Sequence, residues 1–329
     1  MKKYNQLTQE ERYHIKLMIA SQIPIPDIAN TMGRHKSTIY RELSRNSGLK
    51  GYRYKQANNK AKQRHQNKHK HIKLTPVLKR YIRFVVSMQQ WSPEQVSGRL
   101  KEFYNISLAT ETVYRYIIAD KMQRGSLYTH LRHCNSRRYT KRYASRNKRI
   151  GIKDRVDISQ RPAVVDKRSI LGDWEADTVI GKGHQGAVVT LIERKSRLYL
   201  AKAISNKRSD LTAHAINELL TPFVKHTATI TFDNGKEFAN HTDISATLDC
   251  DTYFAKPYSA WQRGANENAN GLLRQYLPKG MPLHKVKQDY VLESVEKMNN
   301  RPRKCLEFKT PWEVFNEIAK EKQNVALMS

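Results

Sequence analysis

The chain has 329 residues, with 60 Lys and Arg against 30 Asp and Glu, which gives a formal net charge of +30 at pH 7. This length allows two or three domains with a substantial core. The sequence lacks an apolar run of about 18 residues, a lipidation signal and a secretory leader, which argues against a membrane-bound or secreted protein. The charge imbalance favours a polyanionic partner instead.

The basic residues are concentrated in the first half of the chain. Residues 1–150 contain 33 Lys and Arg and 8 Asp and Glu, whereas residues 151–329 contain 27 and 22. The first half is therefore expected to bind phosphates, and most carboxylates lie in the second half. Cys134, Cys250 and Cys305 are scattered and lack CxxC spacing. They favour free thiols in a reducing cytoplasm over disulfides or a zinc site.

Residues 1–48 have the pattern of a helix-turn-helix DNA-binding domain. Ala29 allows two helices to approach closely, Gly33 supplies the turn, and Ile39 and Leu43 anchor the second helix. A helical hairpin that only packs is the alternative, but the basic context favours DNA binding. The side chains expected to face a major groove of double-stranded DNA are Lys36, Ser37, Tyr40, Arg41, Ser44 and Arg45.

Residues 49–74 are predicted to be a basic linker or weak helix. Between Leu43 and Pro93 the chain has 13 Lys and Arg and no acidic residue. Such a segment could follow a phosphate backbone, and a solvated tether is the simpler interpretation.

A second helical module is predicted over residues 75–122, followed by a basic connecting segment over residues 123–160. Ser92 and Gln95 predict a capping box at the start of one helix. A later helix carries Arg115 among exposed basic and aromatic residues, and Arg115 is expected to contact DNA. The module resembles a second helix-turn-helix without a turn glycine.

From about residue 161 the pattern changes to alternating strands and helices. Three strands, a helix, a fourth strand and further helices are the order of an RNase H-like α/β domain, expected over residues 161–329. The strands are predicted at 173–180, 187–193, 197–204, 227–233 and 253–255, and the helices at 210–223 and 261–277.

Acidic residues occupy three places in this domain. Asp173, Glu175 and Asp177 alternate along the first strand and therefore share one face. Asp233 follows the fourth strand beside an Asn-Gly turn, where it could bind a metal ion or only cap the turn. Glu267 lies in a later helix, and the three places together favour the metal-binding interpretation.

The motifs in this chain resemble those of the DDE insertion-sequence transposases, and specifically of the IS30 family. The resemblance covers nearly the whole chain and implies a catalytic triad of Asp177, Asp233 and Glu267. There are 33 residues between the last two, and Arg274 follows Glu267 by two helical turns. The family usually has Gly where Ala176 stands. Besides the helix-turn-helix, the matching motifs are WSPEQV at 91–96, GDWEAD at 172–177, FDNGKEF at 232–238 and RGANEN at 263–268.

This resemblance implies an all-α N-terminal region followed by a retroviral-integrase-type catalytic domain. The implied activity is binding of terminal inverted repeats and metal-dependent cleavage and joining of DNA by a homo-oligomer in the bacterial cytoplasm, at the nucleoid. Two Mg²⁺ ions are implied, with Mn²⁺ as a substitute, because in-line displacement at a phosphodiester needs hard oxygen ligands around the metal. By resemblance Asp177 bridges both ions, and Asp233 and Glu267 each bind one.

Other acids and other functions stay open on the residues alone. Asp173 and Glu175 are expected to lie behind the ligands or to face solvent, Glu237 is expected to be solvated, and Asn270 and Arg274 are candidates for contacts with the DNA backbone. A DNA-binding regulator with a ligand-sensing α/β domain would need neither a metal ion nor Glu267. A structure-specific nuclease would hydrolyse DNA without joining it.

Overall fold

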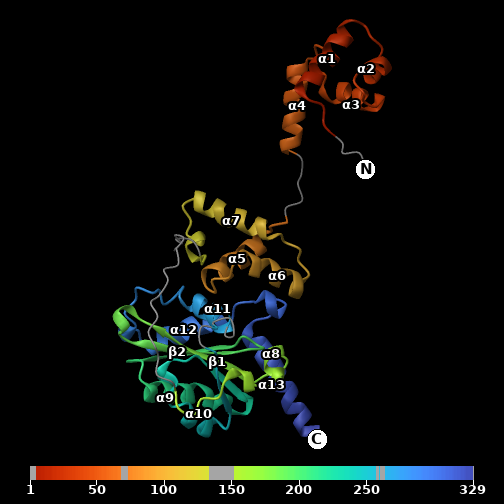
Figure 1. Cartoon of the computed structure of the whole chain (residues 1–329). Coiled ribbons are helices and arrows are strands. Elements are labelled where there is room, and N and C mark those ends of the chain that lie inside the picture. Colours follow the sequence, from red (N-terminus) through yellow and green to blue (C-terminus); the bar gives the residue numbers. More distant parts are fainter. Residues whose placement is uncertain (1–4, 68–72, 133–151, 257–258, 260–263, 329) are drawn as a thin grey trace. The chain divides into compact units, whose positions relative to one another are not determined.

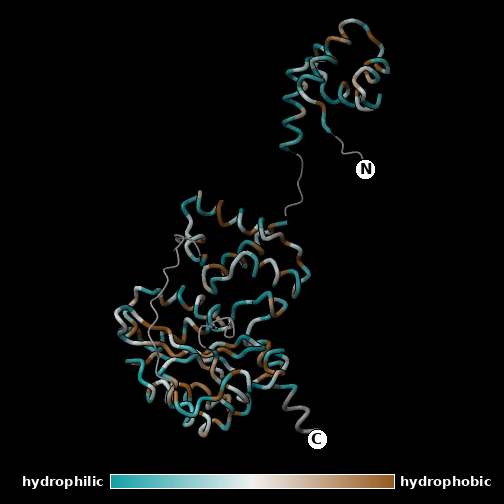
Figure 2. The backbone as a smooth tube through the Cα atoms, viewed as in Figure 1, coloured by the Kyte–Doolittle hydropathy of each residue, from teal (hydrophilic) through white to brown (hydrophobic). Residues whose placement is uncertain are grey.

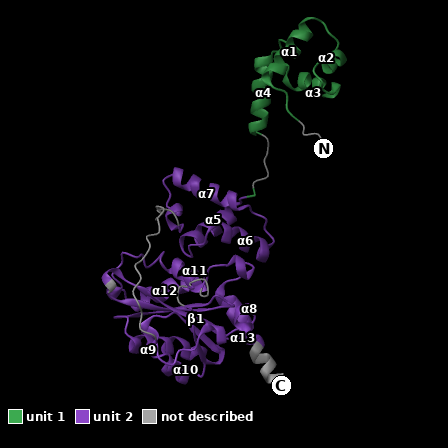
Figure 3. Ribbon diagram, in the orientation of Figure 1, with its two compact units in different colours: residues 1–73 green, residues 74–329 purple. Residues whose placement is uncertain are grey.

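The computed structural model describes residues 5–67, 73–132, 152–256, 259 and 264–328. The chain divides into two compact units, residues 1–73 and residues 74–329, which Figure 3 colours separately. Within the described residues, no helix is both long enough and apolar enough to cross a membrane.

The described part of the first unit contains four helices: α1 (Gln9–Ala20), α2 (Ile25–Thr31), α3 (Lys36–Asn46) and α4 (Tyr54–Asn67), shown in Figure 1. Its core contains Ile15, Ile28 and Ile39, one from each of the first three helices. Gly33, between α2 and α3, has a φ of 60°, which glycine adopts without steric cost. These features confirm the predicted helix-turn-helix.

The basic segment predicted as a linker contains α4, which packs against α1 and α3. Asn58 of α4 is buried and accepts a hydrogen bond from Arg12 at 3.1 Å. Arg12 also forms a buried ion pair with Glu42 at 2.8 Å, and the Tyr52 hydroxyl donates to Glu42 at 3.1 Å. Because polar groups make these contacts, α4 has little apolar periodicity from which its packing could be predicted.

The second unit begins with a helical module of α5 (Pro76–Ser87), α6 (Pro93–Tyr104), α7 (Thr110–Met122) and the short 3₁₀ turn η1 (Leu127–His130). Ser92 and Gln95 form the predicted capping box at the start of α6. Ile82, Val96 and Leu127 belong to one core, so residues beyond 122 contribute to the module. Residues 133–151 of the expected connecting segment lie outside the described residues.

The rest of the unit is built on a five-stranded sheet of order β3-β2-β1-β4-β5. β1 pairs antiparallel with β2, and β2 with β3, whereas β1–β4 and β4–β5 are parallel. This topology confirms the RNase H-like α/β fold. The strands are β1 (Asp173–Ile180), β2 (Ala187–Glu193), β3 (Tyr199–Ile204), β4 (Thr229–Phe232) and β5 (Asp251–Phe254).

Helices cover both faces of this sheet (Figure 1). On one face α9 (Ser209–Leu220), α10 (His241–Leu248) and α13 (Pro311–Met328) pack over Trp174 and Ala176. On the other, α11 (Gly264–Leu273) and α12 (Gln288–Asn299) pack over Val179 and Tyr199. The strands are accordingly rich in apolar residues (Figure 2). Since side chains alternate along β1, its odd-numbered acids lie on the α11 face.

Short elements complete the second unit. Residues 261–263 of the expected helix 261–277 lie outside the described residues, and the chain after α11 continues as a turn. The short elements are α8 (Ala163–Lys167), η2 (Ile158–Gln160), η3 (Lys182–His184), η4 (Thr221–His226), η5 (Lys236–Phe238), η7 (Leu283–Lys285) and η8 (Lys304–Leu306).

The helical module packs directly on the C-terminal part of the α/β domain. Arg99 of α6 pairs with Glu313 of α13, with a hydrogen bond of 2.8 Å. Buried Arg301 donates to the side chain of Gln90 at 2.9 Å. At Gly98 a Cβ atom would lie 2.1 Å from the ring of Phe308, so the absence of a side chain allows this close approach.

Candidate active site

Asp177 lies on β1, and Asp233 directly follows β4, the parallel neighbour of β1. The β1–β4 register ends with Glu175 opposite Thr231, and Asp177 and Asp233 are each two residues further along the chain. Both carboxylates are half-buried. Asp233 accepts a hydrogen bond from the Gly235 amide at 2.8 Å, so it also caps the turn after β4. The sheet therefore places two acids at the point where β4 ends.

The carboxylate of Asp177 is oriented by a chain of hydrogen bonds. Asn270 of α11 donates through Nδ2 to Asp177 Oδ2 at 2.9 Å. The Tyr199 hydroxyl donates to Asn270 Oδ1 at 2.7 Å, which fixes which way the amide points. Burial, and secondly the charge of Asp177, raises the pKa of Tyr199, so the hydroxyl stays a donor. Tyr199 had no signal in the sequence beyond its strand.

Glu267 lies near the start of α11 and is exposed. It lines a hollow of about 370 Å³ together with Arg132 and Asn268. In the part of the chain that the structure describes, no three or more His, Cys, Asp or Glu side chains are close enough to hold a metal ion. Glu267 precedes Asn270 by three residues and shares its side of the helix, but it does not join Asp177 and Asp233 in one group.

Asp173 and Glu175, on the same face of β1 as Asp177, are buried, which excludes the solvent-facing alternative for both and agrees with the other expectation, that they lie behind the ligands. Asp173 accepts a hydrogen bond from the Thr229 hydroxyl at 2.7 Å. Glu175 pairs with buried Arg194 at 3.2 Å and accepts from the backbone amide of Asn266 at 3.2 Å. Glu175 thus attaches the first turn of α11 to β1. Burial lowers the pKa of Arg194, against the effect of Glu175.

The expectation that Glu237 is solvated is also wrong. Its carboxylate is buried, accepts a hydrogen bond from the Thr178 hydroxyl at 2.9 Å and pairs with Lys207. The cause is the next residue, because Phe238 is fully buried against Phe232, with ring centroids 4.8 Å apart. This packing turns Glu237 towards the sheet, beside the residue that follows Asp177.

Comparison with known proteins adds sequence relatives to this geometry. Residues 3–46 match the helix-turn-helix domain family. The chain is 40% identical to the transposase for insertion sequence element IS4351 of Bacteroides fragilis, over 95% of this chain and 96% of that protein. It is 32% identical to the transposase InsI for insertion sequence element IS30A of Escherichia coli, over 94% of this chain and 83% of that protein. The chain belongs to the IS30 family of insertion-sequence transposases.

One solved structure similar to this IS30-family chain is the catalytic core domain of BIV integrase. It matches with a TM-score of 0.38 and 19% sequence identity, over 46% of this chain and 97% of that one.

The IS30-family helix-turn-helix exposes the expected residues of α3. Lys36, Tyr40 and Arg41 are exposed, as are Ser44 and Arg45, whereas Ser37 is half-buried. The Arg41 guanidinium donates to the Ser37 hydroxyl at 2.9 Å and lies along the helix surface.

The two arginines expected to contact DNA in the second unit are differently placed. Arg115 is exposed on α7 and pairs with Glu111 at 3.1 Å. Arg274 is half-buried and donates to the backbone carbonyls of Ile180 at 3.1 Å and Leu277 at 3.3 Å. Burial lowers the pKa of Arg274. In this structure its guanidinium therefore binds protein backbone, near the end of β1.

Proposed function

We propose that this IS30-family chain binds the terminal inverted repeats of its insertion sequence and catalyses metal-dependent cleavage and joining of DNA strands. The observation that carries the proposal is that Asp177 lies on β1 and Asp233 directly follows the adjacent strand β4, with α11 hydrogen-bonded to Asp177 through Asn270. Glu267 lies one helical turn before Asn270. The relatives that cover nearly the whole chain bear the name transposase, which supports the same activity.

The donor chemistry of the site fits Mg²⁺. Carboxylate oxygens are the hard ligands that Mg²⁺ prefers, and one or two of them often suffice alongside water and substrate phosphates. Asp177 and Asp233 meet this requirement by their register, and Glu267 is the proposed third ligand for a pair of ions. When bound, the metal supplies charge stabilisation and activation of the attacking oxygen for an in-line displacement, and Mn²⁺ can replace Mg²⁺.

The chain's own residues prepare this site before any ligand binds. Tyr199 and Asn270 hold one oxygen of Asp177, and the Thr178 amide holds the other at 2.8 Å. Glu175 fixes the start of the helix that carries Glu267. A carboxylate held in this way needs little rearrangement to take up a cation, which is the requirement for preorganised electrostatic stabilisation.

The proposed division of labour follows the predicted domains. Residues 1–48 read the DNA sequence through α3, and the basic residues of 49–74 and 75–122, Arg115 among them, bind phosphates. Residues 123–160 connect these parts to the catalytic domain, residues 161–329, where Arg274 is a further candidate for DNA. The active form is proposed to be a homo-oligomer on double-stranded DNA in the bacterial cytoplasm, since two element ends must be joined.

The test is a gel assay with labelled element ends and the Asp233→Asn protein. The substitution keeps the size of the side chain but removes its charge, so cleavage and joining should fall by several orders of magnitude, equivalent to about 4 kcal/mol or more. Binding of the ends should persist, because α3 lies in the other unit. Asp243→Asn, at an exposed position of α10, is the matched control and should retain activity.

Other outcomes separate the alternative functions. Wild-type protein that nicks but never joins the ends would indicate a nuclease. Wild-type joining by the Asp233→Asn protein would contradict the proposed site, and specific binding without any metal-dependent chemistry would indicate a regulator.

A further inference from the structure

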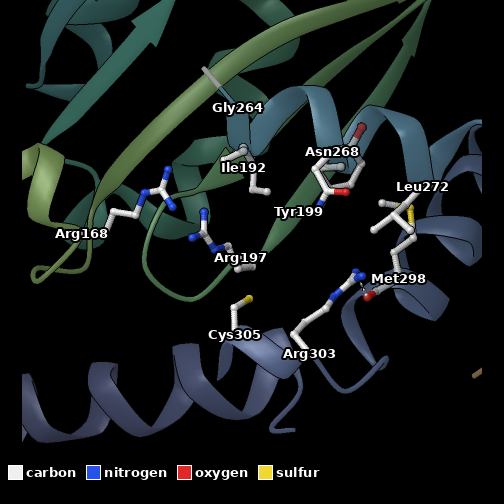
Figure 4. Close-up of a pocket in the computed structure, with 12 residues that line it drawn as sticks. Arg168, Ile192, Arg197, Tyr199, Gly264, Asn268, Leu272, Met298, Arg303 and Cys305 are labelled. Carbon is white, nitrogen blue, oxygen red and sulfur yellow. Dashed lines mark hydrogen bonds between the residues drawn. The ribbon is translucent and has the colours of Figure 1, made fainter. Parts of the chain in front are cut away.

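A second pocket lies beside α11, on the face of the sheet that α11 and α12 cover (Figure 4). Its volume is about 220 Å³. Three arginines line it, each from a different segment: Arg168 after α8, Arg197 in the β2–β3 turn and Arg303 after α12. None of them belongs to the sites considered above.

The positive charge of these arginines is not balanced locally. Within the described part of the chain, no carboxylate lies within ion-pair distance of Arg168, Arg197 or Arg303. Burial, and secondly the nearby Arg301, lowers the pKa of Arg303 to about 10, which still leaves it charged at neutral pH. Arg168 is exposed, Arg197 and Arg303 are half-buried, and Arg303 also donates to the Met298 carbonyl at 2.8 Å. Three positive charges around one pocket create a potential that attracts an anion.

Two of these arginines stand where the backbone favours other residues. Arg168 has a φ of 53° and Arg197 a φ of 64°, the left-handed region in which Gly and Asn are the residues of least cost. The turns themselves do not need arginine at these positions, and both side chains line the same pocket.

The pocket adjoins the proposed active site. Gly264 and Asn268 of α11 line both this pocket and the hollow that contains Glu267. An anion in the pocket and the carboxylate of Glu267 would therefore both lie beside the first turn of α11. A DNA strand that crosses the active site carries further phosphates on either side of the reacting one.

We propose that Arg168, Arg197 and Arg303 bind a backbone phosphate of the DNA strand that lies in the active site. The guanidinium fork matches phosphate oxygens and stays charged, which suits a contact that positions a strand without reading its sequence. The proposal rests on the proposed function and adds to it the place where the strand is held beside Glu267.

The test compares DNA binding by the full-length chain and its Arg168→Asn/Arg197→Asn variant. Asn tolerates the left-handed backbone, so the variant should fold and its Tm should be unchanged or higher. Its Kd for duplex DNA, with or without the element end, should rise. The slope of log Kd against log salt concentration should become shallower by about 0.9 for one lost phosphate contact.

Two control variants distinguish this contact from a loss of net charge. Lys225→Gln/Lys320→Gln removes two exposed charges from segments on the opposite face of the sheet, η4 and α13, and should leave the slope unchanged. Arg168→Lys/Arg197→Lys keeps the charge and should retain most of the slope.

The proposed phosphate contact is refuted if the Arg168→Asn/Arg197→Asn variant binds DNA with the same Kd and the same salt slope as the Lys225→Gln/Lys320→Gln control. An unchanged slope, combined with inorganic phosphate raising the Tm of wild-type protein alone, would likewise overturn it in favour of a free-anion site. Neither result contradicts the proposed function. That proposal is contradicted by a different result, namely wild-type protein that does not join DNA ends.

Discussion

At the scale of single residues, the most informative contact is the one between Asn270 and Asp177. The sequence predicts a contact between Asn270 and the DNA backbone. In the structure Asn270 instead forms hydrogen bonds with Asp177, a proposed metal ligand, and with the Tyr199 hydroxyl. Tyr199 is thus a positioning residue that acts on Asp177 through Asn270. It lies on β3, two strands from β1, which carries Asp177, so only the fold brings it into the site.

The Tyr199→Phe variant should show this role. Without the hydroxyl, Asn270 Oδ1 loses its donor and the amide is free to turn away from Asp177. We expect joining to slow by about fivefold, which is equivalent to about 1 kcal/mol, the net value of one hydrogen bond. The Mg²⁺ concentration for half-maximal activity should rise.

Tyr290→Phe is the control for this prediction, because that hydroxyl, on α12, donates to the backbone carbonyl of Tyr276 at 3.2 Å and does not contact Asn270. A Tyr199→Phe protein with wild-type Mg²⁺ dependence would show that Asn270 is oriented by other means.

At the scale of elements, α3 and α4 present two kinds of basic residue. Arg41 is exposed on the helix expected to enter the major groove, and Lys62 is exposed on α4. Arg41→Ala should weaken binding to the element ends by about 1–3 kcal/mol, the discrimination of a good base contact, with little effect on random DNA. Lys62→Ala should weaken binding to both DNAs equally and lower the salt dependence.

Competition binding with end and random duplexes across a salt series measures both effects. If the two variants lose affinity alike on both DNAs, α3 is not the helix that reads the sequence.

Elements with regular apolar or capping patterns could be predicted from the sequence. Ser92 and Gln95 identify the start of α6, and the alternation of Asp173, Glu175 and Asp177 places all three on one face of β1. Contacts between polar groups that lie far apart in the chain could not be predicted in this way. The packing of α4 depends on Arg12 and Asn58, and the burial of Glu237 depends on Phe238 reaching Phe232. Periodicity records which faces are apolar, not which polar partners meet.

At the scale of the whole molecule, ion pairs join the helical module to the catalytic domain: Arg99 with Glu313, and the more exposed Glu94 with Lys304. Burial raises the pKa of Glu313, but the Arg99 guanidinium and Thr310 outweigh it and hold that pKa below its ordinary value of 4.5. Because the pKa is lower in the folded state, the stabilisation is complete above pH 4.5 and is lost as the pH falls through the folded pKa.

Thermal unfolding against pH should show this loss. The Tm difference between wild-type protein and the Glu313→Gln variant should be constant near neutral pH and shrink below pH 4.5, where wild-type Glu313 becomes protonated too. Since Glu313 is partly exposed, high salt should reduce the difference. A difference that stays constant down to low pH would mean that Arg99 contributes nothing through its charge.

The close fit of Gly98 against Phe308 bears on the distance along the DNA between the helical module and the active site. With Arg99 and Arg301 it joins the helical module and the catalytic domain into one body. A duplex bound by exposed residues of α7 would then reach Asp177 and Asp233 at a fixed number of base pairs from the site bound by α7. The module would then set the position of cleavage. Base pairs inserted between the α7 binding site and the end of the element should shift the cleavage position relative to that end by the same number.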